Sequence, residues 1–134
     1  MKSEVILKFK HYRMRNLIDS ILNGKQPVAQ EGNVIAYELT PQEYRELRKQ
    51  TSAQTTIPVG ATTKEHTHEH KSFYLSKKLD VIVGVGKKLL KLPKLALSII
   101  PQGTIHPWQN NSGEDGEVCD VYTGTFIHEK HVIL

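Results

Sequence analysis

The sequence predicts a mainly β protein: one small domain with a short extension of strand and helices before a barrel. The chain has 134 residues, a usual length for a single domain. From Thr55 onward the apolar residues recur with a period of two, and turn-forming residues separate short apolar stretches. Many short strands at regular spacing are typical of a sandwich, barrel or jelly roll. We therefore expect residues 1–54 to pack on a barrel made by residues 55–134, within one structural domain.

Three elements are expected before residue 40. Val5–Phe9 has the alternating pattern of a half-buried strand. Between Met14 and Leu22 the apolar residues fall at the spacing of one helix face, and Gly24 follows as a C-terminal stop. The next stretch, Val34–Leu39, is expected to be a strand.

A second helix is expected to begin after Thr40. The side chain of Thr40 can cap the helix, and Pro41 loses no hydrogen bond at the first helical position. Glu43 can complete a capping box with Thr40. We expect this helix to end before Thr51.

Beyond the helices, turn residues divide the chain into short apolar stretches. Gly84-Val85-Gly86 is one such turn, because it lacks the third glycine and the following helix of a dinucleotide-binding loop and therefore predicts a hairpin. The expected barrel stretches are Thr55–Val59, Thr63–His70, Phe73–Leu75, Asp80–Val85, Lys88–Leu92, Leu95–Ile100, Trp108 and Val118–Ile127.

Composition and charge argue against several classes of protein. With 38% hydrophobic and 24% charged residues the sequence is globular rather than disordered. The net charge of +4 is a mild excess, and without a recognised nucleic-acid module it argues against nucleic-acid binding. The single cysteine, Cys119, excludes an intrachain disulfide and fits an inert core residue in the cytoplasm. The polar N-terminus and the lack of an apolar run of about 20 residues argue against a signal peptide and a membrane span.

The first functional signal is the segment His66-Thr67-His68-Glu69-His70. On a strand, alternate side chains share one face, so the three imidazoles can point the same way. Buried together they would need a partner, and neutral imidazole is a common ligand of Zn, Cu, Fe and Ni. An exposed, solvated His/Glu-rich segment explains this pentapeptide equally well.

A second segment favours the metal hypothesis. The two segments are Gly60-x5-His66-x-His68 and Pro101-x-Gly103-x-x-His106-x3-Asn110. Together they are similar to the paired motifs of the cupin superfamily, over more than half of the chain. The resemblance implies a cupin-type jelly-roll barrel in which His66, His68 and His106 project into the barrel mouth. It also implies a divalent metal ion on these histidines, with Fe, Mn, Zn and Ni as candidates.

The sequence departs from the cupin pattern at the carboxylate ligand. Cupins usually add a glutamate four or five residues after the second histidine, and this chain has Ser72 and Phe73 there. Three outcomes remain: a three-histidine centre with open coordination positions, a centre completed by His70 or Glu69, or a degenerate site without metal. Ser72 is a candidate pocket residue in each case.

Two aromatic residues are further pocket candidates. Tyr74 shares strand parity with His66 and either reaches the pocket or fills the core. Trp108 either forms a wall of the pocket or packs against the N-terminal extension. By resemblance, Asn110 ties down the turn before the Gly-rich loop. His128 and His131 are expected at the surface.

Two functions are consistent with this site. The first is a metal-dependent enzyme acting on a small molecule, by oxygenase, isomerase or hydrolase chemistry. The second is a non-catalytic barrel that binds a small ligand or has a regulatory role, which the missing glutamate favours. Three neutral ligands leave the metal with its full charge, so an anionic ligand is expected. The resemblance also implies a homodimer, for which Val5–Phe9 is a candidate pairing strand.

Overall fold

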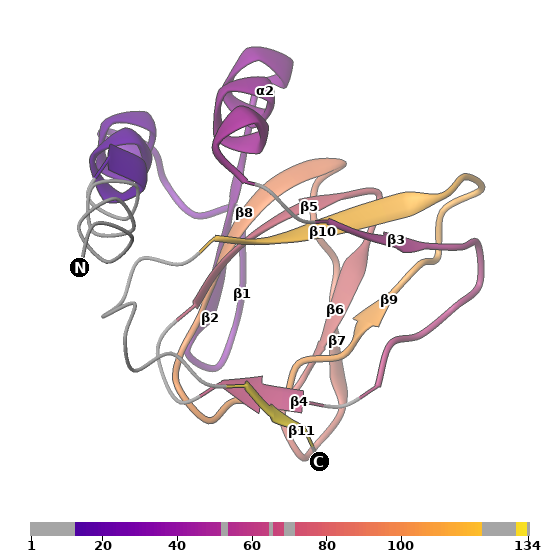
Figure 1. Cartoon of the computed structure of the whole chain (residues 1–134). Coiled ribbons are helices and arrows are strands. Elements are labelled where there is room, and N and C mark those ends of the chain that lie inside the picture. Colours follow the sequence, from indigo (N-terminus) through magenta and orange to yellow (C-terminus); the bar gives the residue numbers. More distant parts are fainter. Residues whose placement is uncertain (1–12, 52–53, 65, 69–71, 122–130, 134) are drawn as a thin grey trace, which may run out of the picture.

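The computed structural model describes residues 13–51, 54–64, 66–68, 72–121 and 131–133 (Figure 1). For Ser72 and for residues 66–68 and 131–133 the structure describes the backbone only. The expected strand Val5–Phe9 lies outside the described residues. Residues 13–22 are helical, as the spacing between Met14 and Leu22 predicts. The remaining elements are β1 (Ala29–Glu31), β2 (Val34–Glu38), α2 (Pro41–Gln50), β3 (Thr55–Ile57), β4 (His66–His68), β5 (Ser72–Lys77), β6 (Asp80–Val83), β7 (Lys88–Leu90), β8 (Leu95–Ile100), β9 (Trp108–Gln109), β10 (Gly116–Val121) and β11 (His131–Ile133).

The described strands form three antiparallel sheets. One has six strands in the order β1-β2-β8-β5-β10-β3, the second has the order β7-β6-β9, and the third pairs β11 with β4. The predicted mainly β fold is confirmed, although among the described strands these sheets are not joined into one closed ring. The sheet begins earlier than residue 55, since β1 and β2 extend its edge beside β8. Figure 1 shows β4 and β11 at the end of the molecule opposite α2.

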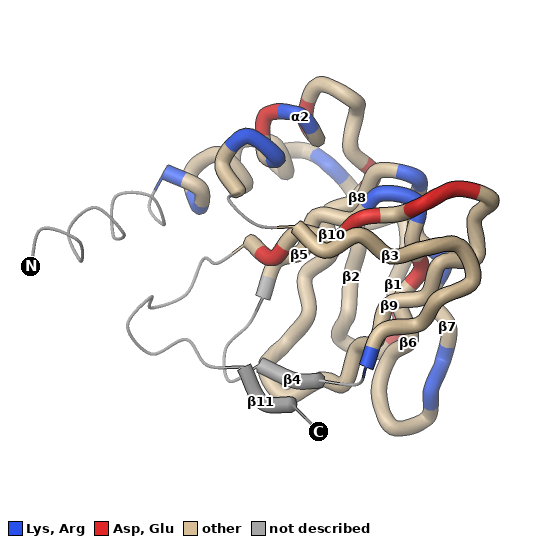
Figure 2. Tube along the Cα trace, turned by 45° about the vertical axis from the view of Figure 1, so that its right-hand side comes forward, with Lys and Arg blue, Asp and Glu red and all other residues tan. Residues whose placement is uncertain are grey.

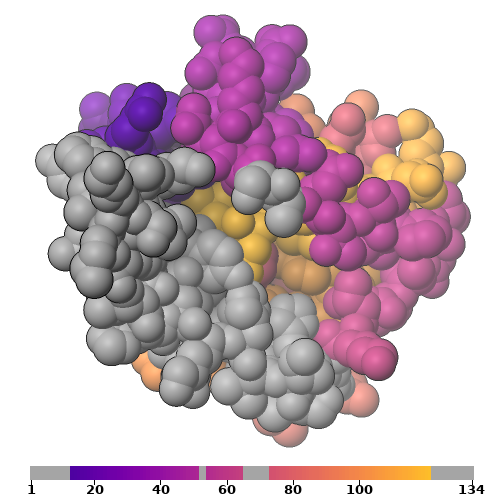
Figure 3. Space-filling view, viewed as in Figure 1, coloured from indigo at the N-terminus to yellow at the C-terminus, as the bar shows by residue number. Residues whose placement is uncertain are grey.

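The six-stranded sheet separates two apolar clusters. The helix-side cluster lies between this sheet and the two helices, which both lie at the upper end of the molecule in Figure 3. Its buried members are Met14, Ile18, Leu39, Tyr44, Leu47, Phe73, Leu75, Leu97, Ile99, Cys119 and Val121. The interior cluster draws residues from the six-stranded and the three-stranded sheet. Its buried members are Val34, Ile57, Tyr74, Leu79, Val81, Leu90, Ile100, Trp108 and Val118.

Local signals determine α2 as predicted. The Thr40 hydroxyl accepts a hydrogen bond from the Glu43 N–H at 3.1 Å, and the Glu43 carboxylate accepts one from the Thr40 N–H at 2.9 Å. Partial burial raises the pKa of Glu43, but the hydrogen bonds from Thr40 and Lys25 outweigh this effect and lower the pKa overall. The helix ends at Gln50, before the C-cap residue Thr51.

A hydrogen bond between side chains joins α2 to the sheet. The Tyr44 hydroxyl donates to a Glu117 carboxylate oxygen of β10 at 2.5 Å, and the Arg48 guanidinium lies 3.7 Å from the same oxygen. Burial is the main cause that raises the pKa of Tyr44 above its usual value, and the bond to Glu117 adds to it. The helix is therefore held by a partly buried polar contact as well as by its apolar face.

The charged residues lie on many elements. Figure 2 shows Lys and Arg on the helices and on the strands, with Asp and Glu among them. Several of the lysines are in ion pairs, such as Lys78 with Glu114 at 2.5 Å and Lys88 with Glu31 at 3.5 Å. None of the helices in the described part of the chain has the length and apolar character needed to cross a membrane.

Candidate metal centre

His106 lies on the loop between β8 and β9 and is buried, with 1% of its surface exposed. Its Nδ1 atom lies 2.7 Å from the Thr104 carbonyl oxygen, and its Nε2 atom lies 2.9 Å from the Tyr74 hydroxyl oxygen. Because a carbonyl oxygen can only accept, Nδ1 carries the hydrogen. In the neutral ring Nε2 then has a lone pair, which accepts the hydroxyl hydrogen of Tyr74.

The backbone around His106 is held on the three-stranded sheet. Gly103 forms the predicted turn with a φ of 78°, a value that favours glycine. The carbonyl oxygens on either side of His106 then accept hydrogen bonds from β6 and its turn: that of Ile105 from the Gly84 N–H and that of Pro107 from the Ile82 N–H, both at 2.8 Å. These bonds fix the backbone from which the imidazole reaches Tyr74.

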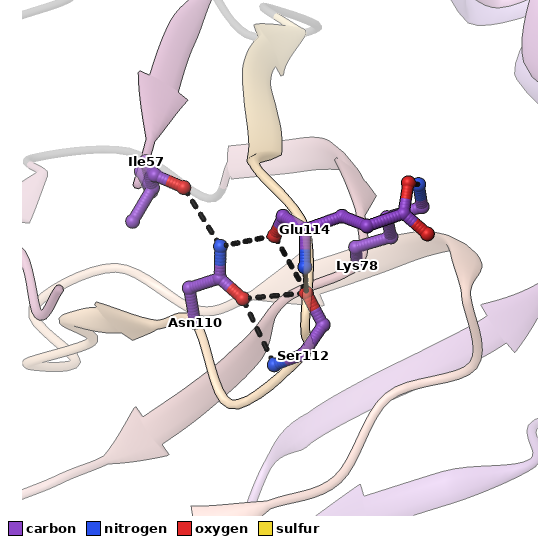
Figure 4. Close-up of polar contacts among 5 residues, drawn as sticks. All are labelled: Ile57, Lys78, Asn110, Ser112 and Glu114. Atoms are coloured by element: carbon purple, nitrogen blue, oxygen red, sulfur yellow. Dashed lines mark hydrogen bonds and ion pairs between the residues drawn. The ribbon is translucent and has the colours of Figure 1, made fainter. Parts of the chain in front are cut away.

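Asn110 fixes the chain immediately after β9. It is 1% exposed, and its Nδ2 atom donates to the carbonyl oxygens of Ile57 at 2.8 Å and Glu114 at 2.9 Å. Its Oδ1 atom accepts from the Ser112 N–H at 2.9 Å and from the Ser112 hydroxyl at 2.7 Å (Figure 4). The side chain thus joins β3 to the β9–β10 turn, which confirms the expected role of Asn110.

Two aromatic side chains lie beside the imidazole of His106. Trp108 is 2% exposed and belongs to the interior cluster, on the opposite face of the sheet from the helices. The ring centroid of Tyr74 lies 5.0 Å from the ring centroid of His106 and 5.4 Å from that of Trp108. The ring centroids of His106 and Trp108 are 6.4 Å apart. Tyr74, the second pocket candidate, also belongs to the interior cluster and is 3% exposed. His106, Tyr74 and Trp108 therefore form one buried group.

A row of polar residues crosses the sheet beside this group. Tyr74 of β5 lies directly opposite Asp120 of β10 on one side and Ser98 of β8 on the other. Directly opposed residues project from the same face of a sheet, so the row faces the interior. Ser76, two positions after Tyr74 on β5, has the same parity. Ser76 and Ser98 are fully buried, and their hydroxyl oxygens have no hydrogen-bond partner among the residues that the structure describes.

The other predicted ligands are placed only by their backbone. His66 and His68 lie on β4, where His68 is directly opposite His131 of β11. His131 was expected simply at the surface, and this register makes it a neighbour of the predicted ligands. His70 and Glu69 lie outside the described residues, and Ser72 is described as the first residue of β5. The described residues contain no group of three or more metal-ligating side chains, so the three-histidine centre stays a prediction.

Cys119 lies on the other face of the sheet. It is fully buried in the helix-side cluster, and burial raises the pKa of its thiol. A buried thiol with a raised pKa is a poor nucleophile. Cys119 is a core residue, as expected.

The comparisons with known proteins identify the fold. No protein-family model matches the sequence, and no curated protein sequence matches it. A solved structure of oxalate decarboxylase is similar to 82% of this chain, with 17% sequence identity and a TM-score of 0.50. A variant of oxalate decarboxylase from Bacillus subtilis matches over 84% of the chain, with 17% identity and a TM-score of 0.48. Salicylate 1,2-dioxygenase from Pseudoaminobacter salicylatoxidans matches over 96%, with 9% identity and a TM-score of 0.46.

The architecture and the first of these matches define a class of protein. The six-stranded and the three-stranded antiparallel sheets contribute residues to one apolar cluster, as the sheets of a β-sandwich or jelly roll do. Within that class the fold is the cupin fold, as the paired motifs suggested. The chain spans about 30% of the length of the oxalate decarboxylase that it matches.

Proposed function

We propose that this chain is a metal-dependent cupin enzyme that acts on a small molecule, with His66, His68 and His106 as metal ligands. The observation that carries the proposal is the hydrogen bonding of His106. Metal-binding histidines nearly always donate their other ring N–H to a carbonyl or carboxylate, which fixes the tautomer. His106 donates Nδ1–H to Thr104 and directs the Nε2 lone pair into the interior.

The residues around His106 suit a buried ligand site. Small-molecule sites are apolar cavities with a few well-placed polar groups. Here Trp108 and the interior cluster exclude water from the imidazole, while the buried hydroxyls of Ser76 and Ser98 can each donate one hydrogen bond to a ligand. A bound divalent ion would supply Lewis-acid or redox chemistry at this place. The protein's own part is to hold the ligands, orient the substrate and keep the site dry.

The substrate that this arrangement favours is small and rich in oxygen. Three neutral imidazoles leave the charge of a divalent ion uncompensated, which favours an anionic ligand. The buried serine hydroxyls suit carboxylate or hydroxyl groups of such a ligand. The similarity to a protein named for its action on oxalate supports the same class of substrate.

Metal analysis of protein purified without a histidine tag tests the proposal. We expect close to one metal ion per chain and a lower melting temperature with EDTA. A ligand at about 100 times its dissociation constant stabilises by about 2.7 kcal/mol, which is roughly 10 °C for a domain of this size. His106→Ala should lose the metal, and His128→Ala, the matched control, should keep it. Metal-free protein with equal melting curves would refute the proposal.

A non-catalytic ligand-binding barrel is the second candidate. The observation that favours it is the hydrogen bond from Tyr74, which occupies the Nε2 atom that a metal would need. This candidate predicts binding of a small anion such as oxalate without turnover. Calorimetric titration with oxalate, followed by assay of its consumption with and without O₂, separates the two functions.

A further inference from the structure

We propose that Tyr74 is a ligand of the metal and supplies, as a phenolate, the anionic oxygen that the absent glutamate would have supplied. The inference rests on the proposed metal site and completes its donor set. It concerns a residue whose side chain is described, in direct contact with His106.

The position of Tyr74 on β5 supports this inference. By resemblance, the cupin glutamate would stand at Ser72 or Phe73, at the start of β5. Phe73 belongs to the helix-side cluster and so points away from the interior. Tyr74 is the next residue of the same strand, and it belongs to the interior cluster. A longer side chain one or two residues further along can therefore bring an oxygen to the interior from the same strand.

The distance between the Tyr74 oxygen and the His106 nitrogen is compatible with a shared metal ion. The Tyr74 hydroxyl oxygen and Nε2 of His106 are 2.9 Å apart. Nitrogen and oxygen ligands bind first-row metal ions at about 2.0–2.1 Å. Two such ligands at right angles around one ion are therefore about 2.9 Å apart, and in a tetrahedral site about 3.3 Å apart. The spacing of the two atoms is that of an ordinary hydrogen bond, and it also permits both atoms to take neighbouring positions on one ion.

The hydrogen between Tyr74 and His106 is the one that a metal ion would replace. Because Nδ1–H is donated to Thr104, the hydrogen between Tyr74 and His106 belongs to the phenol. A metal ion bound by both atoms would take the place of this hydrogen, which leaves to solvent as a proton. The Nε2–metal and oxygen–metal bonds replace the hydroxyl bond and its hydrogen bond. Three imidazoles and one phenolate then reduce the charge of a divalent ion to +1, as a glutamate would.

A purely structural role for Tyr74 makes different predictions. In that case the Tyr74 hydroxyl orients His106 without binding the metal, and a metal ion on Nε2 would displace the Tyr74 ring from His106. Tyr74→Phe keeps the aromatic contacts with Trp108 and His106 and removes only the oxygen. Tyr44→Phe is the matched control, since it removes a hydroxyl on the other side of the sheet, where Tyr44 contacts Glu117.

Copper(II) is a suitable probe, because it binds imidazole sites tightly and a phenolate on Cu²⁺ gives a visible charge-transfer band. We expect this band in the parent and in Tyr44→Phe and its loss in Tyr74→Phe. We also expect Tyr74→Phe to weaken Zn²⁺ binding by about 100-fold or more, the upper end of the loss that supporting residues cause. The band is measured on the parent, so the test does not depend on how the variant folds.

The outcomes separate the inference from the function on which it rests. If the parent binds Cu²⁺ and Zn²⁺ stoichiometrically without the band, Tyr74 is not a ligand and the three-histidine proposal survives. An unchanged Zn²⁺ affinity in folded Tyr74→Phe overturns the inference in the same way. If the parent binds neither ion, both proposals are wrong.

Discussion

The Asn110→Ala substitution removes four hydrogen bonds from a single buried side chain. Two of them satisfy the carbonyl oxygens of Ile57 and Glu114, and two satisfy the backbone and hydroxyl of Ser112. A typical hydrogen bond contributes about 1 kcal/mol net, and a buried group left without a partner costs about 1–3 kcal/mol. Ser112 and Glu114 are at least partly exposed and can bond water instead. We therefore expect a loss of about 3 kcal/mol, or roughly 10 °C in melting temperature.

The neighbouring residue offers a matched control. Asn111 donates from its amide to Asp80 at 3.1 Å and to Gln109 at 3.0 Å, and it is exposed. Asn111→Ala should change the free energy of unfolding by less than about 1 kcal/mol, because water replaces these partners. Urea denaturation of the two variants, compared at equal m-values, measures the difference. If the two variants differ by less than about 1 kcal/mol, Asn110 does not hold the β3 strand and the β9–β10 turn together as argued.

Two further substitutions test the two faces of the sheet. Tyr44→Phe should lower stability by about 1–2 kcal/mol through loss of the bond to Glu117. The pKa of Tyr44 is raised in the folded state, so the parent should lose stability as the pH rises above about 10, where tyrosine in the unfolded chain ionises. The Tyr44→Phe variant should lose less stability over the same range. Urea denaturation of both proteins across this pH range measures the difference. Ser98→Ala removes a buried hydroxyl without a partner among the described residues, so thermal unfolding should show equal or higher stability. A loss above 1 kcal/mol there would contradict this account of the interior.

The parts of the fold that local chemistry determines were predictable from the sequence. The capping box of Thr40 and Glu43 and the end of α2 before Thr51 depend on residues within one or two turns, and both were predicted correctly. The pairing of β2 with β8 was not, because it joins segments about 60 residues apart. Alternation along Val34–Leu39 predicts a strand and does not specify its partner.

The same limit applies to the candidate site. The second motif singled out His106. The sequence did not decide whether Tyr74 lines a pocket or fills the core, because alternation along one strand does not show which face of the sheet points to the interior. The register of β5 with β8 and β10 places Phe73 on the helix side and Tyr74 in the interior cluster beside His106. Ser98 was missed altogether. Its only signal was its position between Leu97 and Ile99, which required knowing that those two residues face the helices.

The two faces of the six-stranded sheet differ in a way that bears on function. Its helix side carries apolar residues on successive strands, such as Phe73, Leu97 and Val121. The interior side carries the hydroxyl groups of Tyr74, Ser76 and Ser98 among its apolar residues. The burial of such groups is unfavourable unless they are hydrogen-bonded. If the interior only stabilised the fold, alanine or valine at Ser98 would serve better. Packing of the helices supplies stability on one face, and this allows the other face to carry polar groups beside His106 that suit a ligand better than they suit a core.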